Sequence, residues 1–220
     1  MRRRTYHHGD LRGALLAALA ELLRQRGVAH VSLRDVARRA KVSHSAPAHH
    51  FGGKSGLLTA FAAEGYERLA GSALAEAVRG VRDGADRLEA VGRGYLRFAV
   101  ENREQFDLMF RVDQLDEDEP RFLQARAAAF GVLADTIAQC ARDGYLRGQD
   151  PQLVAIAAWA LVHGAAALFL SGRLTERIGI DDPERLASDL CRLFVDAVLR
   201  RAPARRARRR RRASPSRTRT

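Results

Sequence analysis

Apolar side chains recur every three or four residues along almost the whole chain, the spacing that places them on one face of a helix. Strand-like alternation is absent, and alanine, leucine and arginine, which favour helices, dominate the sequence. The first apolar stripe runs from Leu11 to Leu23. It lies between Asp10, a helix-capping residue type, and Gly27, a residue type that commonly ends helices. The pattern therefore predicts an all-α protein of about nine helices.

A second, short helix is predicted to follow the first. Ser32 can cap its N-terminus, and Asp35, three residues later, completes a short-acid version of the capping box. The apolar residues that follow are spaced for a helix of two turns that ends near Ala40.

A third short helix is predicted over residues 44–50. Ser43 can cap it, and Pro47 falls near its first turn, where the missing N–H costs least. A pair of glycines then interrupts the chain, and Lys54 opens a long fourth helix.

The rest of the chain is predicted to form longer helices, two of which begin at an Asp-Pro pair. The expected helices cover residues 84–101, 103–110, 120–143, 151–171 and 183–201. We divide the chain into a head at 1–52 (with a basic arm at 1–8), a body at 53–201 and a tail at 202–220. The tail contains mainly arginine, proline and serine, which cannot form a core, so it is predicted to be disordered.

The net charge of +12 is distributed unevenly. Residues 200–220 hold eleven arginines and no acid, which leaves 12 − 11 = +1 for residues 1–199. Residues 1–70 carry twelve Lys/Arg against five Asp/Glu (+7), and residues 71–199 carry fifteen against twenty-one (−6). A cationic head on a mildly anionic body indicates that a polyanion meets the head.

The two short helices joined by the turn "KVS" form a candidate helix-turn-helix. In such a unit the second helix lies in the major groove of DNA, and its outward residues reach the base edges. The polar residues of the second helix can fill that role, and basic residues nearby can meet phosphates, among them Arg38 and Arg39. Together with the cap serines, the candidate DNA-binding residues are Ser32, Arg34, Lys41, Ser43, His44, Ser45, His49 and Lys54.

Residues 5–62 resemble the DNA-binding domain of the TetR family of transcriptional regulators. The matching features are the "VARRAKVS" turn, the short helix that ends in His-Phe, and the Gly-x-Lys entry to the fourth helix. The segment "AWALVHGAAALFLSG", residues 158–172, resembles a C-terminal domain subtype with a Trp-x-x-x-His-Gly pattern. The head departs from the family at Ala48, where a phosphate-contacting tyrosine is usual, and at Ser55, where an acid is usual.

The resemblance implies a homodimer whose last two long helices, 151–171 and 183–201, pack against their symmetry mates. It also implies a double-stranded operator that is nearly palindromic, and an unidentified small-molecule effector bound in the body. The expected function is a ligand-responsive DNA-binding regulator, most simply a repressor. The alternative is a nonspecific nucleic-acid-condensing protein whose binding comes from the arginine-rich tail.

Aromatic and polar side chains of the body either belong to the core or form the wall of an effector pocket. His163, one turn after Trp159, is in the same way either a satisfied core histidine or a polar group in a pocket. The candidate pocket residues are Tyr95, Phe98, Phe106, Met109, Phe110, Phe130, Trp159 and His163.

Other functional classes find little support in the sequence. His44 and His49 are five residues apart, about 500° around a helix, so they do not converge on a metal. No catalytic spacing or phosphate-binding glycine loop is present, so we expect neither an enzyme nor a cofactor. Because charged residues recur along the chain, we expect no uncharged run of the roughly 18 to 20 residues that a membrane span needs. With no secretory signal, and with Cys140 and Cys191 expected to be buried thiols, we expect a soluble cytoplasmic protein.

Overall fold

The computed structural model describes residues 11–146 and 148–199, and every regular element in these residues is a helix. The all-α prediction is confirmed, with ten α-helices in the described part of the chain instead of about nine. Short 3₁₀ segments η1 and η3 lie at Val28–His30 and Val112–Gln114, and a π-helical segment η2 lies at Leu69–Ala75. The α-helices are α1 Leu11–Arg26, α2 Leu33–Ala40, α3 Ala46–Phe51, α4 Lys54–Arg68, α5 Gly84–Glu101, α6 Arg103–Met109, α7 Pro120–Arg142, α8 Pro151–Leu170, α9 Arg173–Ile178 and α10 Pro183–Ala197.

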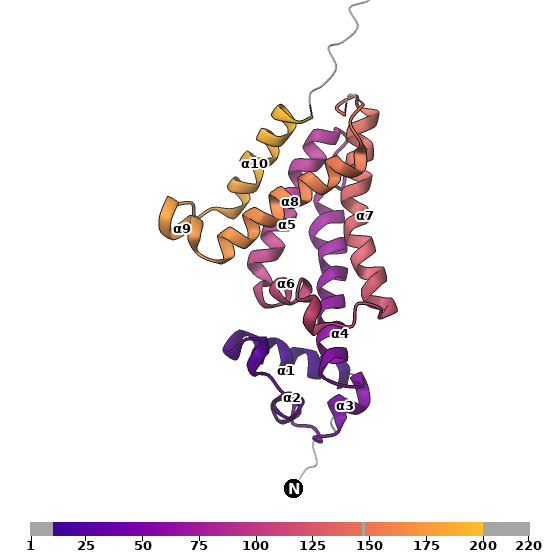
Figure 1. The fold of residues 1–220 in the computed structure, drawn as a ribbon, viewed down its shortest axis with the longest axis vertical. Coiled ribbons are helices and arrows are strands. Elements are labelled where there is room, and N and C mark those ends of the chain that lie inside the picture. The colour runs from indigo at the N-terminus through magenta and orange to yellow at the C-terminus, as the bar shows by residue number, and fades with distance from the viewer. Residues whose placement is uncertain (1–10, 147, 200–220) are drawn as a thin grey trace, which may run out of the picture.

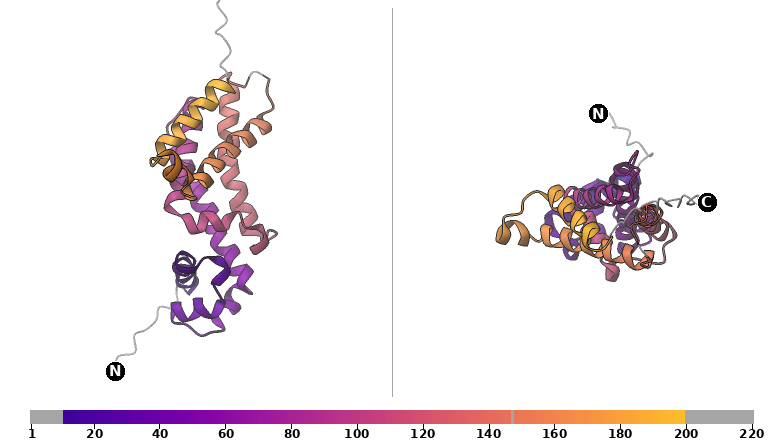
Figure 2. Two further views of the ribbon diagram at one scale, coloured as in Figure 1. Left: turned by 60° about the vertical axis from the view of Figure 1, so that its left-hand side comes forward. Right: turned by 90° about the horizontal axis from the view of Figure 1, so that it is seen from above.

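The molecule is elongated, with α1, α2 and α3 grouped at one end (Figure 1). Helix α4 leaves this group and runs into the body, where it packs against α7 and α6. Helix α8 crosses the long helices of the body obliquely, α10 lies along α5, and α9 projects from the side (Figure 2). The head and the body are therefore joined through one continuous helix and through α6, which also contacts α1.

Helix α2 has the ends that its sequence predicts. The hydroxyl of Ser32 accepts a hydrogen bond from the backbone N–H of Asp35, and the Asp35 carboxylate accepts one from the backbone N–H of Ser32. At the other end Lys41 has a left-handed backbone with φ of 56°. Its N–H donates to Arg38 and that of Val42 donates to Ala37, which is a Schellman motif. The turn of the helix-turn-helix is thus set by local hydrogen bonds.

Helix α3 begins later than the sequence pattern predicts. The pattern indicates a helix over residues 44–50 with Ser43 as its cap, but the helix starts at Ala46 and Ser45 is its cap residue. The reason is Pro47, because a helix capped by Ser43 would need an N–H at Pro47 to donate to the Ser43 carbonyl. Instead the N–H of Ala46 donates to that carbonyl in a tight turn, and the first full helical bond runs from His49 to Ser45.

A close approach of α3 and α4 depends on Gly56. A Cβ atom at this position would lie 2.0 Å from the carbonyl oxygen of Phe51, the last residue of α3. No real contact is that short, so the first turn of α4 can pack on α3 only while residue 56 is glycine. Nothing in the local sequence pattern marks this glycine as special.

The body helices follow the predicted ranges closely, with a few exceptions. Helix α9 and the π-helical segment η2 were not predicted, and α10 ends at Ala197 rather than at residue 201. The basic arm predicted at 1–8 and the disorder predicted for residues 202–220 lie outside the described residues. Cys140 and Cys191 are buried free thiols, as expected.

Helix α8 corrects another expectation. Its twenty residues contain no charged side chain, so the prediction that charges interrupt every apolar run is wrong. By length and composition α8 could cross a membrane, a test that core helices of soluble proteins also pass. In this structure α8 packs against α5, α7 and α10.

Candidate functional site

The outer surface of α2, the turn and α3 carries the residues predicted to bind DNA. All of them except Lys54 are exposed. Lys54 is partly buried, and its Nζ donates to the carbonyl oxygen of Val28 at 3.2 Å. Lys54 therefore ties the start of α4 to the loop before α2.

The polar side chains of this surface differ in their hydrogen-bond partners. The Ser32 hydroxyl is occupied by its capping partner Asp35, with the two oxygens 2.5 Å apart. The Ser43 and Ser45 hydroxyls lie 3.4 Å from one another. His44 and His49 are exposed, and so is Ala48, at the position where the family usually has tyrosine.

The arginines of α2 are partly neutralised by neighbouring acids. Arg38 pairs with Asp35, and Arg39 pairs with Glu21 of α1. Hydrogen bonds from Ser32 and the positive charge of Arg38 hold the pKa of Asp35 below its ordinary value, although desolvation opposes them. Exposed ion pairs of this kind are weak, so a phosphate can compete with the acids for both arginines.

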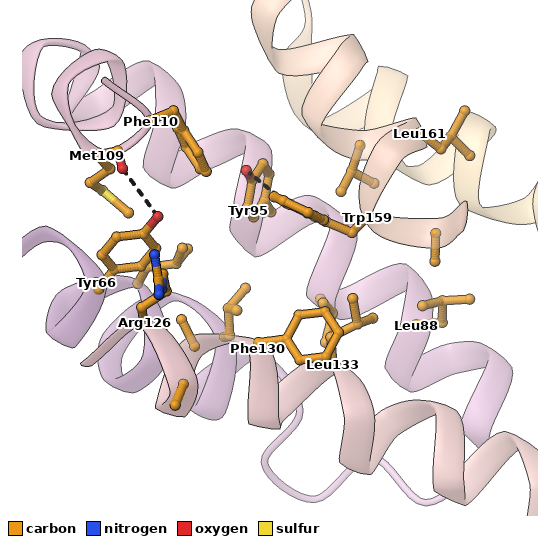
Figure 3. A pocket seen from close by; sticks show the side chains of 18 of the residues that line it. Tyr66, Leu88, Tyr95, Met109, Phe110, Arg126, Phe130, Leu133, Trp159 and Leu161 are labelled. Atoms are coloured by element: carbon orange, nitrogen blue, oxygen red, sulfur yellow. Dashed lines mark hydrogen bonds between the residues drawn. The ribbon is translucent and has the colours of Figure 1, made fainter. Parts of the chain in front are cut away.

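The body contains a cavity of about 540 Å³ between α4, α5, α6, α7, α8 and α10 (Figure 3). This volume is within the roughly 300–1,000 Å³ range of small-molecule sites. Five of the predicted pocket residues line it: Tyr95, Met109, Phe110, Phe130 and Trp159.

The other three predicted pocket residues lie elsewhere. Phe98 is buried in the core and does not line the cavity. Phe106 and His163 line a smaller hollow of about 310 Å³ that shares Phe110 with the main cavity. His163 has features of both a core histidine and a polar pocket group. It packs among aromatic rings, and it also makes a polar contact with a residue of the main cavity.

That contact joins the Tyr95 hydroxyl to Nδ1 of His163 over 2.8 Å. The indole N–H of Trp159 donates to the Tyr95 oxygen at 3.4 Å, so the Tyr95 proton is free to be donated to a neutral imidazole. Desolvation raises the pKa of Tyr95 and lowers the pKa of His163. Both groups are therefore neutral at neutral pH, and the wall they form carries no charge.

The cavity has a second tyrosine and one ion pair. The Tyr66 hydroxyl donates to the carbonyl oxygen of Met109 at 3.2 Å, and burial raises the pKa of Tyr66 to about 12. Arg126 of α7 donates to Glu117 at 2.9 Å, and its guanidinium lies 5.3 Å from the centre of the Phe122 ring. Among the described residues that line the cavity, Arg126 and Glu117 are the two that carry charge.

Several lining residues could not be identified from the sequence. Leu88, Val91, Leu133 and Phe194 read only as core positions of separate helices, and nothing local shows that they face a shared space. Cys191 also lines the cavity, and burial raises the pKa of its thiol to about 12, so it is an inert wall residue.

Within the described part of the chain, no group of three or more His, Cys, Asp and Glu side chains converges as a metal site would require. The His50 ring packs edge-on against Phe51 at 5.3 Å.

Comparisons with known families identify the chain. Residues 15–61 match the family described as bacterial regulatory proteins, tetR family, and residues 88–194 match the tetracyclin repressor-like C-terminal domain. The chain belongs to the TetR family of transcriptional regulators. The resemblance seen in the sequence is confirmed, and a DNA-binding transcriptional regulator is favoured over a nonspecific condensing protein. TetR regulators are generally non-enzymatic.

Solved structures agree with this assignment. A protein of unknown function from Rhodococcus sp. RHA1 is 30% identical over 90% of this chain and 100% of its own, with a TM-score of 0.77. The TetR regulator PfmR from Thermus thermophilus is 22% identical over 86% of this chain and 98% of its own, with a TM-score of 0.64. A tetR-family regulatory protein from Rhodococcus RHA1 is 20% identical over 87% and 97% of the two chains, with a TM-score of 0.69. These last two show the shared fold alone. A search of curated proteins finds no match.

Proposed function

We propose that this TetR-family chain is a ligand-responsive repressor that binds a near-palindromic operator as a homodimer. The observation that carries the proposal is that one chain has an exposed helix-turn-helix at one end (Figure 1) and an apolar cavity within the body (Figure 3). Such a protein works on the chromosome in the cytoplasm and needs no enzymatic activity, cofactor or membrane.

In this proposal the exposed residues of the helix-turn-helix divide between bases and phosphates. His44, Ser45 and His49 lie at the N-terminal turn and on α3, where a recognition helix meets base edges. The remaining exposed candidates Arg34, Lys41 and Ser43 would contact the DNA backbone, and Ser32 would do so by turning its hydroxyl from Asp35 to a phosphate. Lys54 would serve less directly, by fixing the start of α4 against Val28.

The outer faces of α8 and α10 support the homodimer. Large apolar side chains are exposed there: Leu153, Ile156 and Leu168 on α8, and Leu193 on α10. Large apolar side chains exposed on two helices that pack against each other are typical of association sites. Two copies packed through these helices would present two recognition helices, which need a spacing of about 34–36 Å to enter successive major grooves.

Helix α6 supports a route from the cavity to the head. Met109, its last residue, and the adjacent Phe110 line the cavity. The Gln105 amide donates to the carbonyl oxygen of Phe61 on α4 at 2.6 Å, and Glu104 pairs with Arg24 of α1 at 3.6 Å. A ligand that moves Phe110 would thus move α6 against both helices that position the head. In thermodynamic terms, the ligand favours dimers whose heads are spaced wrongly for the operator.

The test is binding to short duplexes from the region of the chain's own gene and its neighbours at physiological salt. We expect one near-palindromic duplex to bind two chains and to outcompete random DNA. If no duplex from this region binds more tightly than random DNA, the proposal is contradicted.

A deletion of residues 203–220 separates the two origins of binding. If recognition is specific, the shortened chain should keep its operator footprint, with weaker binding to all DNA. If the deletion abolishes binding altogether, the tail-driven alternative is correct.

A further inference from the structure

We infer that the cavity binds an amphipathic monocarboxylate, a molecule with an extended hydrocarbon body and one terminal carboxylate group. The inference rests on the proposed function as a ligand-responsive regulator and gives the chemical class of its ligand. It is carried by the distribution of charge along the cavity wall, which is polar at one end and apolar at the other (Figure 3).

The apolar end is formed by buried side chains that can neither donate nor accept hydrogen bonds. Leu88, Val91, Val162 and Phe194 line it and are each at most 9% exposed. A polar ligand group placed there would lose its hydrogen bonds to water without replacement, which is costly. Hydrocarbon is the chemistry that this end accepts.

The charged end is open to solvent and contains Arg126 and Glu117. Arg126 lies within the long helix α7, where its guanidinium contacts the ring of Phe122. Glu117 lies outside the regular helices, in the segment between η3 and α7. The two side chains are 41% and 45% exposed, so their ion pair is weak and can be exchanged.

This arrangement favours an anion over a cation. A ligand carboxylate can take the place of Glu117 on Arg126, and the released Glu117 is then solvated, so no charge is left buried and unpaired. A ligand cation would have to pair with Glu117 beside the guanidinium of Arg126, which the helix and the Phe122 ring hold in place. Like charges at that distance oppose binding. One arginine therefore selects one carboxylate, and the rest of the wall selects the chain attached to it.

Trp159 makes the test direct, because it is the single tryptophan of the chain and it lines the cavity. Its fluorescence is followed while the full-length protein is titrated with dodecanoate, dodecanol or dodecylammonium. We expect dodecanoate to bind most tightly, and each methylene removed from it to weaken binding about fourfold.

Two substitutions with opposite expected signs sharpen the test. Arg126→Gln should weaken dodecanoate binding about tenfold and leave dodecanol unchanged, because it removes a charge-assisted hydrogen bond. Glu117→Gln should tighten dodecanoate binding, because it removes the competing carboxylate. Arg142→Gln is the matched control, since Arg142 lies on the same helix but does not line the cavity, and it should bind as the wild type does.

Three results would overturn the inference. Equal binding of dodecanoate and dodecanol, with no effect of Arg126→Gln, would assign a neutral ligand. Tightest binding of dodecylammonium, weakened by Glu117→Gln, would assign a cation. Failure of all three probes to bind would show that the cavity does not accept long hydrocarbon chains. These outcomes are independent of DNA: if dodecanoate binds but leaves operator affinity unchanged, the ligand class stands and the proposed ligand response fails.

Discussion

The functional side chains of the head and of the body differ in exposure, polarity and position in the sequence. In the head, the functional side chains are exposed, polar and clustered in one short stretch of sequence, between Ser32 and Lys54. In the body, the cavity draws its lining from α4 to α10, and its wall is almost entirely apolar. The head is therefore a surface set by local hydrogen bonds, whereas the body is a space set by how distant helices pack. A substitution that disrupts DNA binding by the head should therefore leave ligand binding by the body intact and measurable, and the reverse should also hold.

The largest effect is expected from Gly56→Ala in the head. The new Cβ would lie 2.0 Å from the Phe51 carbonyl oxygen, so α3 and α4 must separate, at a cost of about 3 kcal/mol. Operator binding should be lost while Trp159 still reports an intact cavity. The matched control is Gly131→Ala on α7, where a Cβ meets nothing within 4 Å and removal of glycine should slightly stabilise the helix. Wild-type operator affinity in Gly56→Ala would contradict the account of the head.

The next effect concerns base recognition by the exposed histidines. His44→Ala and His49→Ala should each reduce operator affinity by about 1–3 kcal/mol and relax the preference at particular base pairs. Affinity for random duplexes should change little, and so should ligand binding in the body. Binding to a library of single-base operator variants measures this. A uniform loss on every duplex would instead make the histidines phosphate contacts.

Lys41 tests whether a functional side chain is held at a strained position. Its φ of 56° costs a lysine about 1 kcal/mol relative to glycine. Lys41→Gly should therefore raise the free energy of unfolding by about 1 kcal/mol while it weakens binding to all DNA. Lys41→Ala is the control, since it removes the charge but keeps the strain. If chemical denaturation shows no difference between the two variants, the backbone at residue 41 is unstrained.

The smallest effect is a pH dependence in the body. Desolvation lowers the pKa of His163 in the folded protein, so the unfolded chain binds more protons below the ordinary histidine pKa of about 6.5. The free energy of unfolding should therefore fall as the pH drops below about 6.5. His163→Gln should flatten this slope in denaturant titrations between pH 7.5 and 5.5. Identical slopes would show that folding does not lower the pKa of His163.

The same contrast explains what could be predicted from the sequence. The start of α2 was predictable because Ser32 and Asp35 cap the helix with hydrogen bonds that span only three residues. The predicted start of α3 is wrong because the missing N–H of Pro47 outweighs the cap signal of Ser43. In both cases the deciding interaction is local, so the residues themselves contain it.

The cavity is different, because its shape depends on contacts between remote helices. Phe98 and Phe106 look equivalent to Phe110 in the sequence, yet only Phe110 lines the main cavity. Arg126 looks like an ordinary exposed arginine of α7, and its position beside Tyr66 in the cavity wall follows only from the packing of α4 against α7. The eight candidate DNA-binding residues are still a prediction; seven of them are exposed, and Lys54 is partly buried.

Recognition of a specific DNA sequence by the head is the central claim. The most direct measurement compares, at physiological salt, the affinity for the selected palindrome with that for a scrambled duplex of the same composition. We predict a ratio of about a thousandfold or more, with two chains bound per palindrome. Equal affinity for the two duplexes would contradict the claim.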